Sequence, residues 1–151
     1  MPIVESEAFA TTEELIERHM DIFQRRGFIL VNQTFDKDRQ VGPRLQFRFF
    51  NERTKLSLDA ALTISTGPRK GIFMVLIVNS RNELLFVDNY LRQHGYTAEA
   101  SLFVCTEEVP DFRNYVEGFL SMLDSVFDNQ LKSILSGEKW ESTPIDWQGY
   151  K

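Results

Sequence analysis

The longest hydrophobic run in the chain covers seven consecutive residues, 72–78. A strand with one face in water alternates apolar and polar side chains, so an uninterrupted run predicts a strand that is covered on both faces. The two segments before it, 44–50 and 55–64, do alternate, and the short polar stretch between them predicts a hairpin. Their inward side chains are predicted to be Leu45, Phe47, Phe49, Leu56, Leu58, Ala60, Leu62 and Ile64. With a further strand at 28–35, the pattern predicts an antiparallel meander of about four strands.

Apolar residues at helical spacing predict three helices, over 11–27, 80–95 and 110–137. The first two begin with the capping-box spacing of a hydroxyl residue and a glutamate, the third begins at a proline, and each ends at a glycine. A turn at 66–71 and a further strand at 100–106 complete the predicted elements. The order α-β-β-β-β-α-β-α predicts an α+β fold with helices packed on an antiparallel sheet of about five strands.

Composition favours a single domain spanning 1–151. With 42% hydrophobic and 26% charged residues, a chain of 151 residues can bury a core without disulfides. The net charge of −5 disfavours nucleic acid, whose phosphates are bound by clustered Lys and Arg. No segment approaches the ~20 apolar residues of a membrane-spanning helix, and the first residues lack a signal-peptide pattern. With Cys105 as the single cysteine, these features predict a cytoplasmic protein that binds neither nucleic acid nor membranes.

The second face of the sheet is predicted to be partly polar and partly apolar. If the inward residues of the third and fourth strands pair, odd-numbered residues of the run 72–78 share a face with the charged residues of the hairpin. The predicted members of this mixed face are Phe73, Val75, Ile77, Arg44, Arg48 and Asp59. An exposed apolar patch of that kind marks an interaction surface, for a homodimer or for another protein, unless the helix at 110–137 covers it.

Residues 138–151 form an aromatic C-terminal tail with neither helical nor strand periodicity. The tail carries Trp140, Trp147 and Tyr150. One alternative is that these large rings dock on their own domain. The other is that the tail is a recognition segment, because tryptophan and tyrosine are favoured anchors at protein interfaces.

Residues that could support catalysis or hold a metal are sparse. His19 and His94 are far apart in the sequence and lack cysteine neighbours, so neither a metal site nor a catalytic residue is predicted. Asp59 could form an anion-binding cluster with Arg44 and Arg48, and the alternative is a solvated cross-strand ion pair. The sequence contains no glycine-rich phosphate loop, and no cofactor is predicted.

The order of elements is loosely similar to that of small acidic secretion chaperones, which also set helices against an antiparallel sheet. The pattern therefore predicts a non-enzymatic, cytoplasmic protein-binding protein of the inhibitor, immunity or chaperone type. It would act through the mixed sheet face or the aromatic tail, and its acidic charge suits a basic partner. The alternative is a small enzyme or ligand-binding domain with a pocket between the sheet and the long C-terminal helix.

Overall fold

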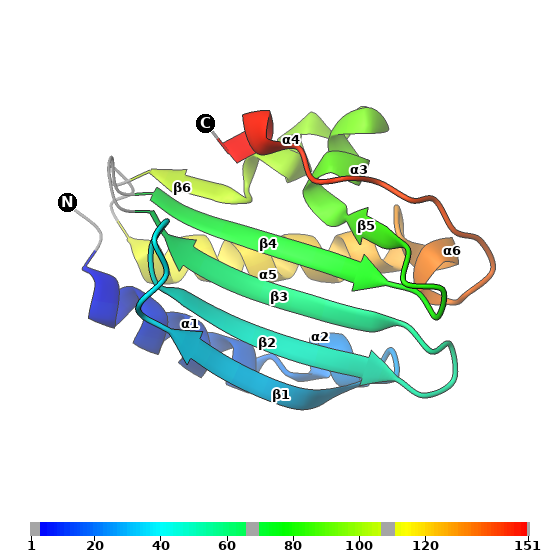
Figure 1. Cartoon of the computed structure of the whole chain (residues 1–151), viewed down its shortest axis with the longest axis horizontal. Coiled ribbons are helices and arrows are strands. Elements are labelled where there is room, and N and C mark those ends of the chain that lie inside the picture. Colours follow the sequence, from blue (N-terminus) through cyan, green and yellow to red (C-terminus); the bar gives the residue numbers. More distant parts are fainter. Residues whose placement is uncertain (1–3, 66–69, 107–110, 151) are drawn as a thin grey trace.

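The computed structural model describes residues 4–65, 70–106 and 111–150, which form a curved antiparallel sheet with helices packed against one face (Figure 1). The strands of the described chain are β1 Phe28–Asp36, β2 Arg44–Asn51, β3 Ser57–Ile64, β4 Lys70–Val78, β5 Leu84–Phe86 and β6 Val104–Thr106. The helices are α1 Glu5–Arg18, α2 Asp21–Gln24, α3 Val87–Gln93, α4 Thr97–Ser101, α5 Phe112–Asp128, α6 Lys132–Leu135 and the 3-10 helix η1 Trp147–Tyr150. The predicted α+β class is confirmed.

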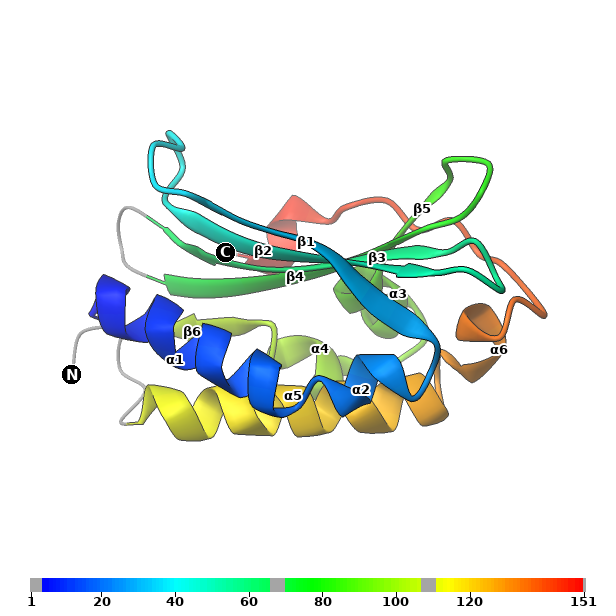
Figure 2. The same cartoon turned by 90° about the horizontal axis from the view of Figure 1, so that it is seen from below.

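The strands lie in the order β1-β2-β3-β4-β5, and β6 pairs with the part of β4 that β5 leaves free. All of these pairings are antiparallel. Figure 2 shows α1 and α5 below the sheet, so this face is covered and the opposite face is not covered by either helix. The hairpin residues predicted to face inward are buried on the helix side.

The first helix begins at Glu5 rather than at the predicted cap, Thr11. The segment before Thr11 is rich in helix-forming residues, and Ala8 and Phe9 extend the buried stripe toward the N-terminus. The helical pattern is interrupted after Arg18, and α2 follows as a separate short helix. Gly27 has a φ of +88° and leads the chain into β1, as predicted for a residue that ends a helix.

The second predicted helix, 80–95, is wrong over residues 80–86. Residues 84–86 form β5, and α3 begins only at Val87. The reason is Asn79, whose side-chain oxygen accepts the backbone N–H of Glu83 at 2.9 Å, while Asn82 adopts a left-handed φ of +61°. These contacts close a hairpin turn that lets β5 pair with β4, so Ser80 and Glu83 do not form a capping box.

The later elements are close to those predicted. The strand predicted at 100–106 is shortened to β6 because α4 occupies residues up to Ser101. The long helix appears as α5 and α6, and Asp111 caps α5 by accepting the backbone N–H of Asn114 at 3.2 Å. Of the turn predicted at 66–71, residues 66–69 lie outside the described residues, as does the predicted helix start at Pro110, while Lys70 and Gly71 belong to β4.

Large rings fill the layer between the sheet and the helices. Phe73 stacks on Phe119 of α5 with ring centroids 4.2 Å apart, and Phe103 meets the same ring edge-on at 5.0 Å. Phe23 stacks on Phe49 at 4.2 Å. The space in which the alternative function placed a ligand pocket is therefore occupied by core side chains.

The predicted face of Phe73, Val75 and Ile77 is wrong. The register of β3 with β4 pairs Leu62 with Phe73 and Leu58 with Ile77, so these residues share the helix-covered face. Phe73 is 2% exposed, and Val75 and Ile77 are fully buried. A uniformly apolar strand has no alternation of its own, so only its register decides which side chains face the helices.

Candidate binding groove on the outer sheet face

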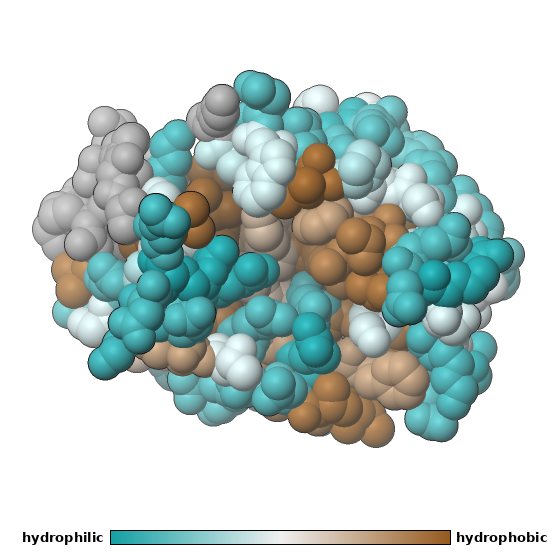
Figure 3. Space-filling model, viewed as in Figure 1, coloured by the Kyte–Doolittle hydropathy of each residue, from teal (hydrophilic) through white to brown (hydrophobic). Residues whose placement is uncertain are grey.

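The opposite face of β4 displays the even-numbered residues of the hydrophobic run. Ile72, Met74 and Leu76 stand opposite Thr63, Ala61 and Asp59 of β3. Each of the three apolar side chains is half-buried. Figure 3 shows hydrophobic residues gathered over the middle of this face, in a hollow bordered by hydrophilic ones.

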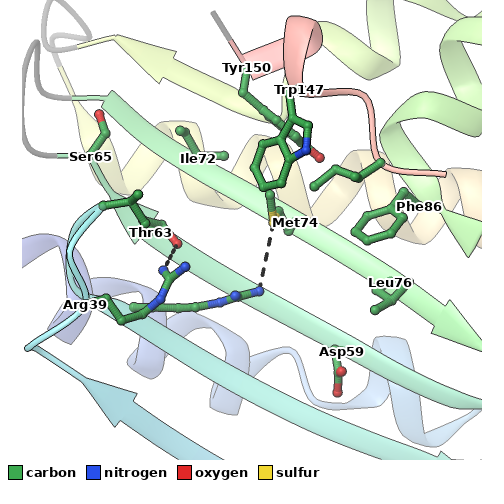
Figure 4. Close-up of a pocket in the computed structure, with 13 residues that line it drawn as sticks. Arg39, Asp59, Thr63, Ser65, Ile72, Met74, Leu76, Phe86, Trp147 and Tyr150 are labelled. Atoms are coloured by element: carbon green, nitrogen blue, oxygen red, sulfur yellow. Dashed lines mark hydrogen bonds between the residues drawn. The ribbon is translucent and has the colours of Figure 1, made fainter. Parts of the chain in front are cut away.

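This hollow is a pocket of about 590 Å³, which we call the outer groove. Its floor is Ile72, Met74 and Leu76, and its other lining residues are Arg39, Val41, Arg44, Asp59, Thr63, Ser65, Phe86, Ile145, Trp147 and Tyr150. Figure 4 shows that the floor comes from β4, while Arg39 and Trp147 approach from opposite sides. The groove therefore lies between the sheet and the C-terminal tail, and most of its lining is apolar.

The tail forms one wall of the groove because it docks beside β5. Thr143 makes a parallel β-bridge with Leu85, in which its backbone N–H donates to Leu84 at 2.8 Å and its carbonyl accepts from Phe86 at 3.0 Å. The side-chain amide of Asn89 donates to the carbonyl of Pro144 at 2.9 Å. These backbone contacts fix the tail along the sheet edge, so its backbone follows the docking alternative.

A charged cluster holds the end of the tail against α3. Arg92 donates to Asp88, which is fully buried, at 2.6 Å, and its Nε lies 3.4 Å from Asp146. The guanidinium group of Arg92 also lies against Gly149, where any side chain would collide with it. Tyr150 is 7% exposed, and burial and the neighbouring Asp88 raise the pKa of its hydroxyl. The cluster orders η1 at the rim of the groove.

The three aromatic residues of the tail have different environments. Trp140 packs against the core, and Tyr150 is buried. Trp147, however, is 65% exposed, and its ring lies 6.3 Å from that of Tyr150 in an edge-on arrangement. Only Trp147, of these three, presents its ring to solvent at the groove.

Two arginines line the end of the groove away from the tail. Arg39 comes from the loop between β1 and β2, and its guanidinium donates to the Thr63 hydroxyl at 3.2 Å. Arg44 opens β2, and a terminal nitrogen of its guanidinium lies 3.9 Å from the Met74 sulfur (dashed lines, Figure 4). Burial and the positive charge of Arg39 lower the pKa of Arg44, partly offset by Asp59 and Tyr150.

Arg48 and Asp59 form the cross-strand ion pair that was one of the two predicted alternatives. They are partners in the register of β2 with β3, and Arg48 Nε donates to Asp59 at 2.9 Å. The hydrogen bond to Asp59 raises the pKa of Arg48. Arg48 is not part of the groove lining, so Arg44 is brought to the groove and Arg48 is not.

The sequence did not single out Ile72, Met74, Leu76 or Arg39 as binding residues. The sequence contains one indication of the groove floor. Side chains alternate between the two faces of a strand, so either the even-numbered or the odd-numbered residues of the run 72–78 had to face away from the helices. Arg39 lies in a loop, whose path relative to the sheet cannot be read from periodicity.

The described residues provide little for catalysis or metal binding. Among them, no group of three or more His, Cys, Asp or Glu side chains is arranged to hold a metal ion. Cys105 is buried, and burial raises its pKa to about 11, so its thiol is a poor nucleophile. Within residues 4–65, 70–106 and 111–150, each helix is too short or too polar to cross a bilayer.

The chain matches no protein-family model, no curated protein and no solved structure.

Proposed function

We propose that this chain is a non-enzymatic protein-binding protein that docks a partner on the outer groove. The observation that carries the proposal is the groove's apolar floor, Ile72, Met74 and Leu76, which α1 and α5 leave uncovered on the far side of the sheet. An apolar depression bordered by polar residues is typical of a protein interaction site. Large rings fill the space between the sheet and α5, which favours a surface function over a pocket in that place.

Trp147 supports this proposal from the tail. Its ring is exposed beside an apolar floor, and tryptophan is enriched among residues that dominate binding energy at interfaces. The tail holding it is anchored by β-bridge and side-chain contacts, so the ring is presented in a fixed position. A preordered anchor costs less conformational entropy on binding than a mobile one.

The net charge and the single cysteine support the remaining features of the proposed function. A net charge of −5 favours approach by a basic protein, because long-range charge steers association. The single cysteine of the sequence, Cys105, suits a reducing compartment and supports a cytoplasmic location. A second copy of the chain remains an alternative partner, for which the oligomeric state is the test.

One observation favours a second candidate function, the binding of a small ligand. At about 590 Å³, the outer groove is within the usual range of ligand pockets, roughly 300 to 1,000 Å³. This site differs from the pocket predicted between the sheet and the long helix. A ligand that copurifies with the protein and shifts the signals of Met74 would favour this candidate.

The experiment that tests the proposed function is affinity capture from the native cell with matched variants. The wild-type chain should retain a stoichiometric partner, and Met74→Glu should lose it, because a charge in the groove floor would be desolvated on docking. Ile29→Glu is the control, since Ile29 is 64% exposed on β1 and lies outside the groove lining. Retention of the partner by Met74→Glu would contradict the proposal, and sedimentation of each variant would identify self-association.

A further inference from the structure

We propose that the Arg39–Arg44 end of the outer groove binds a carboxylate of the partner, placed next to an apolar side chain that enters the groove. This inference rests on the proposed protein-binding function and names the chemistry of the segment that binds. The occupant is a partner segment in which a glutamate or aspartate adjoins a large apolar residue.

The first observation is that the described residues offer these two guanidinium groups no carboxylate. Arg39 donates to the neutral hydroxyl of Thr63 at 3.2 Å, and Arg44 contacts the Met74 sulfur at 3.9 Å. The buried Nε of Arg44 has no hydrogen-bond partner. A guanidinium carries five N–H donors in a planar fork that matches a carboxylate. The contacts with Thr63 and Met74 use one terminal nitrogen of each arginine, which leaves the other terminal nitrogen of each for a carboxylate.

The second observation is that the nearby acidic groups form no ion pair with Arg39 or Arg44 among the described residues. Asp59 accepts two bonds from Arg48, at 2.9 and 3.3 Å. Asp36 stands opposite Arg44 in the register of β1 with β2, but it accepts the backbone N–H of Asp38 and forms no ion pair with Arg44. In the described part of the chain, the positive charge of Arg39 and Arg44 therefore has no paired acid.

The third observation concerns the electrostatic cost of this arrangement. Arg44 is half-buried and close to Arg39, and both burial and the like charge lower the pKa of Arg44. Two neighbouring cations repel one another, and an incoming anion relieves this repulsion while accepting charge-assisted hydrogen bonds. A neutral or basic group would leave the repulsion in place, so the charge complementarity selects an acid.

The apolar floor begins directly beside these arginines. Met74 contacts Arg44 and is followed along β4 by Leu76, with Trp147 across the groove. A segment whose carboxylate reaches Arg39 and Arg44 thus places its neighbouring side chain over the floor. The positive charge is confined to this end of the groove, since the chain as a whole carries a net charge of −5. The negative chain repels a purely acidic segment, and a purely apolar segment leaves the two arginines without an anion, so both bind less well than a segment with both features.

The test uses three model peptides, Ac-GFLEG-NH2, Ac-GFLQG-NH2 and Ac-GFLKG-NH2, titrated into the full-length protein. Binding is followed by NMR through the methyl signals of Ile72 and Met74. We expect the glutamate peptide to shift these signals and to bind about tenfold more tightly than the glutamine peptide, because a hydrogen bond to a charged group is worth more than a neutral one. The lysine peptide should bind most weakly.

Matched variants assign the preference to the groove. In Arg44→Gln the glutamate and glutamine peptides should bind equally, and in Arg39→Gln their difference should fall. Arg53→Gln is the control, because it removes the same charge from an exposed arginine in the turn after β2 that lies outside the groove lining. That variant should retain the preference for the glutamate peptide.

Three outcomes overturn the inference: equal binding of the glutamate and glutamine peptides by the wild type, no shift of the groove methyl signals with any peptide, or a preference that survives in both Arg44→Gln and Arg39→Gln. A different result would overturn the proposed function itself. In the affinity capture, Met74→Glu would then retain the partner, whatever the peptides show. A partner lost from Met74→Glu without any glutamate preference would overturn only the carboxylate recognition.

Discussion

Arg44 and Arg48 lie on the same face of β2, yet their surroundings give them different roles. Arg48 is paired with Asp59, and the hydrogen bond between them raises the pKa of Arg48. Arg44 is half-buried beside Arg39, and burial lowers its pKa. The sequence placed both arginines on the polar face, but it could not separate them, because the difference depends on the loop that carries Arg39 and on the tail.

The burial of Cys105 predicts how slowly the thiol of this residue reacts. Burial raises the pKa of its thiol from 9.0 to about 11, so at pH 8 the reactive thiolate is about 100-fold scarcer than for an exposed cysteine. We expect iodoacetamide to modify the native protein at least about 100-fold more slowly than the urea-unfolded protein. Mass spectrometry over time measures the modification, and comparable rates in the two states would contradict the buried placement.

At the scale of elements, β4 shows how much of a strand's environment the hydrophobic pattern can predict. The pattern predicted a strand with both faces covered, and one set of its side chains is buried under the helices. The assignment of Phe73, Val75 and Ile77 to the other face was wrong, because an all-apolar strand carries no mark of its inward side. The stacking of Phe73 on α5 and the register of β4 with β3 determine which set of side chains faces the helices.

The two faces of β4 predict losses of stability of different size when glutamate is introduced. Val75→Glu should cost about 4 kcal/mol or more in the free energy of unfolding, because Val75 is fully buried and an unpaired charge there is strongly unfavourable. Met74→Glu should cost less than about 1 kcal/mol, since Met74 is half-buried at the groove. Urea denaturation of both variants measures these differences. Similar losses would mean that the faces of β4 are wrongly assigned.

The tail, residues 138–151, is the second element whose role the sequence left open. Its aromatic composition suggested either docking or recognition, and the structure combines a docked backbone with an exposed Trp147. The docking could not be derived from periodicity, because the single bridge of Thr143 to Leu85 joins residues far apart in the chain. It also depends on β5, which the helical pattern of that segment had concealed.

Truncation after Glu138 should lower stability substantially. The deletion removes the buried Tyr150 and the partly buried Trp140, and the loss of buried aromatic side chains costs about 3 to 5 kcal/mol, or a fall in Tm on the order of 10 °C. Trp147→Ala is the control and should change the free energy of unfolding by less than about 0.5 kcal/mol, because its ring is exposed. Thermal denaturation compares the two, and an unchanged Tm after truncation would show that the tail is not docked.

At the scale of the whole molecule, ion pairs connect the N-terminal helices to α5. Arg26, after α2, lies 2.7 Å from Asp128 and 2.9 Å from Asp124. At the other end of α5, Arg113 lies 2.9 Å from Glu14 of α1. These pairs tie the start of the chain to its last long helix across the helical layer. The sequence predicted each helix but not this pairing, since no periodicity relates the two segments.

These pairs predict the direction of the acid dependence. The hydrogen bond from Arg26 lowers the pKa of Asp128 below its ordinary value of 3.8. A carboxylate with a lowered pKa in the folded state stabilises the fold above its ordinary pKa, and this contribution is lost as the pH falls through the lowered value. Asp128→Asn should therefore lose stability at pH 7 and show a shallower decrease as the pH falls below the ordinary value of 3.8.

Urea denaturation at several pH values measures this dependence. Glu13→Gln is the control, because Glu13 is exposed on α1 and forms no ion pair with another described residue. The control should follow the wild type at each pH. An acid limb equally steep in wild type and Asp128→Asn would show that Asp128 does not contribute.

The position of the outer groove also has a consequence for biosynthesis. Its floor comes from β4, whereas the wall that carries Ile145, Trp147 and Tyr150 is translated much later. During synthesis, a nascent chain with a finished β-meander still lacks both α5 beneath the sheet and the tail beside it. The outer groove is therefore complete only after the tail has been synthesised, and a partner that needs Trp147 can recognise only chains extended through that residue.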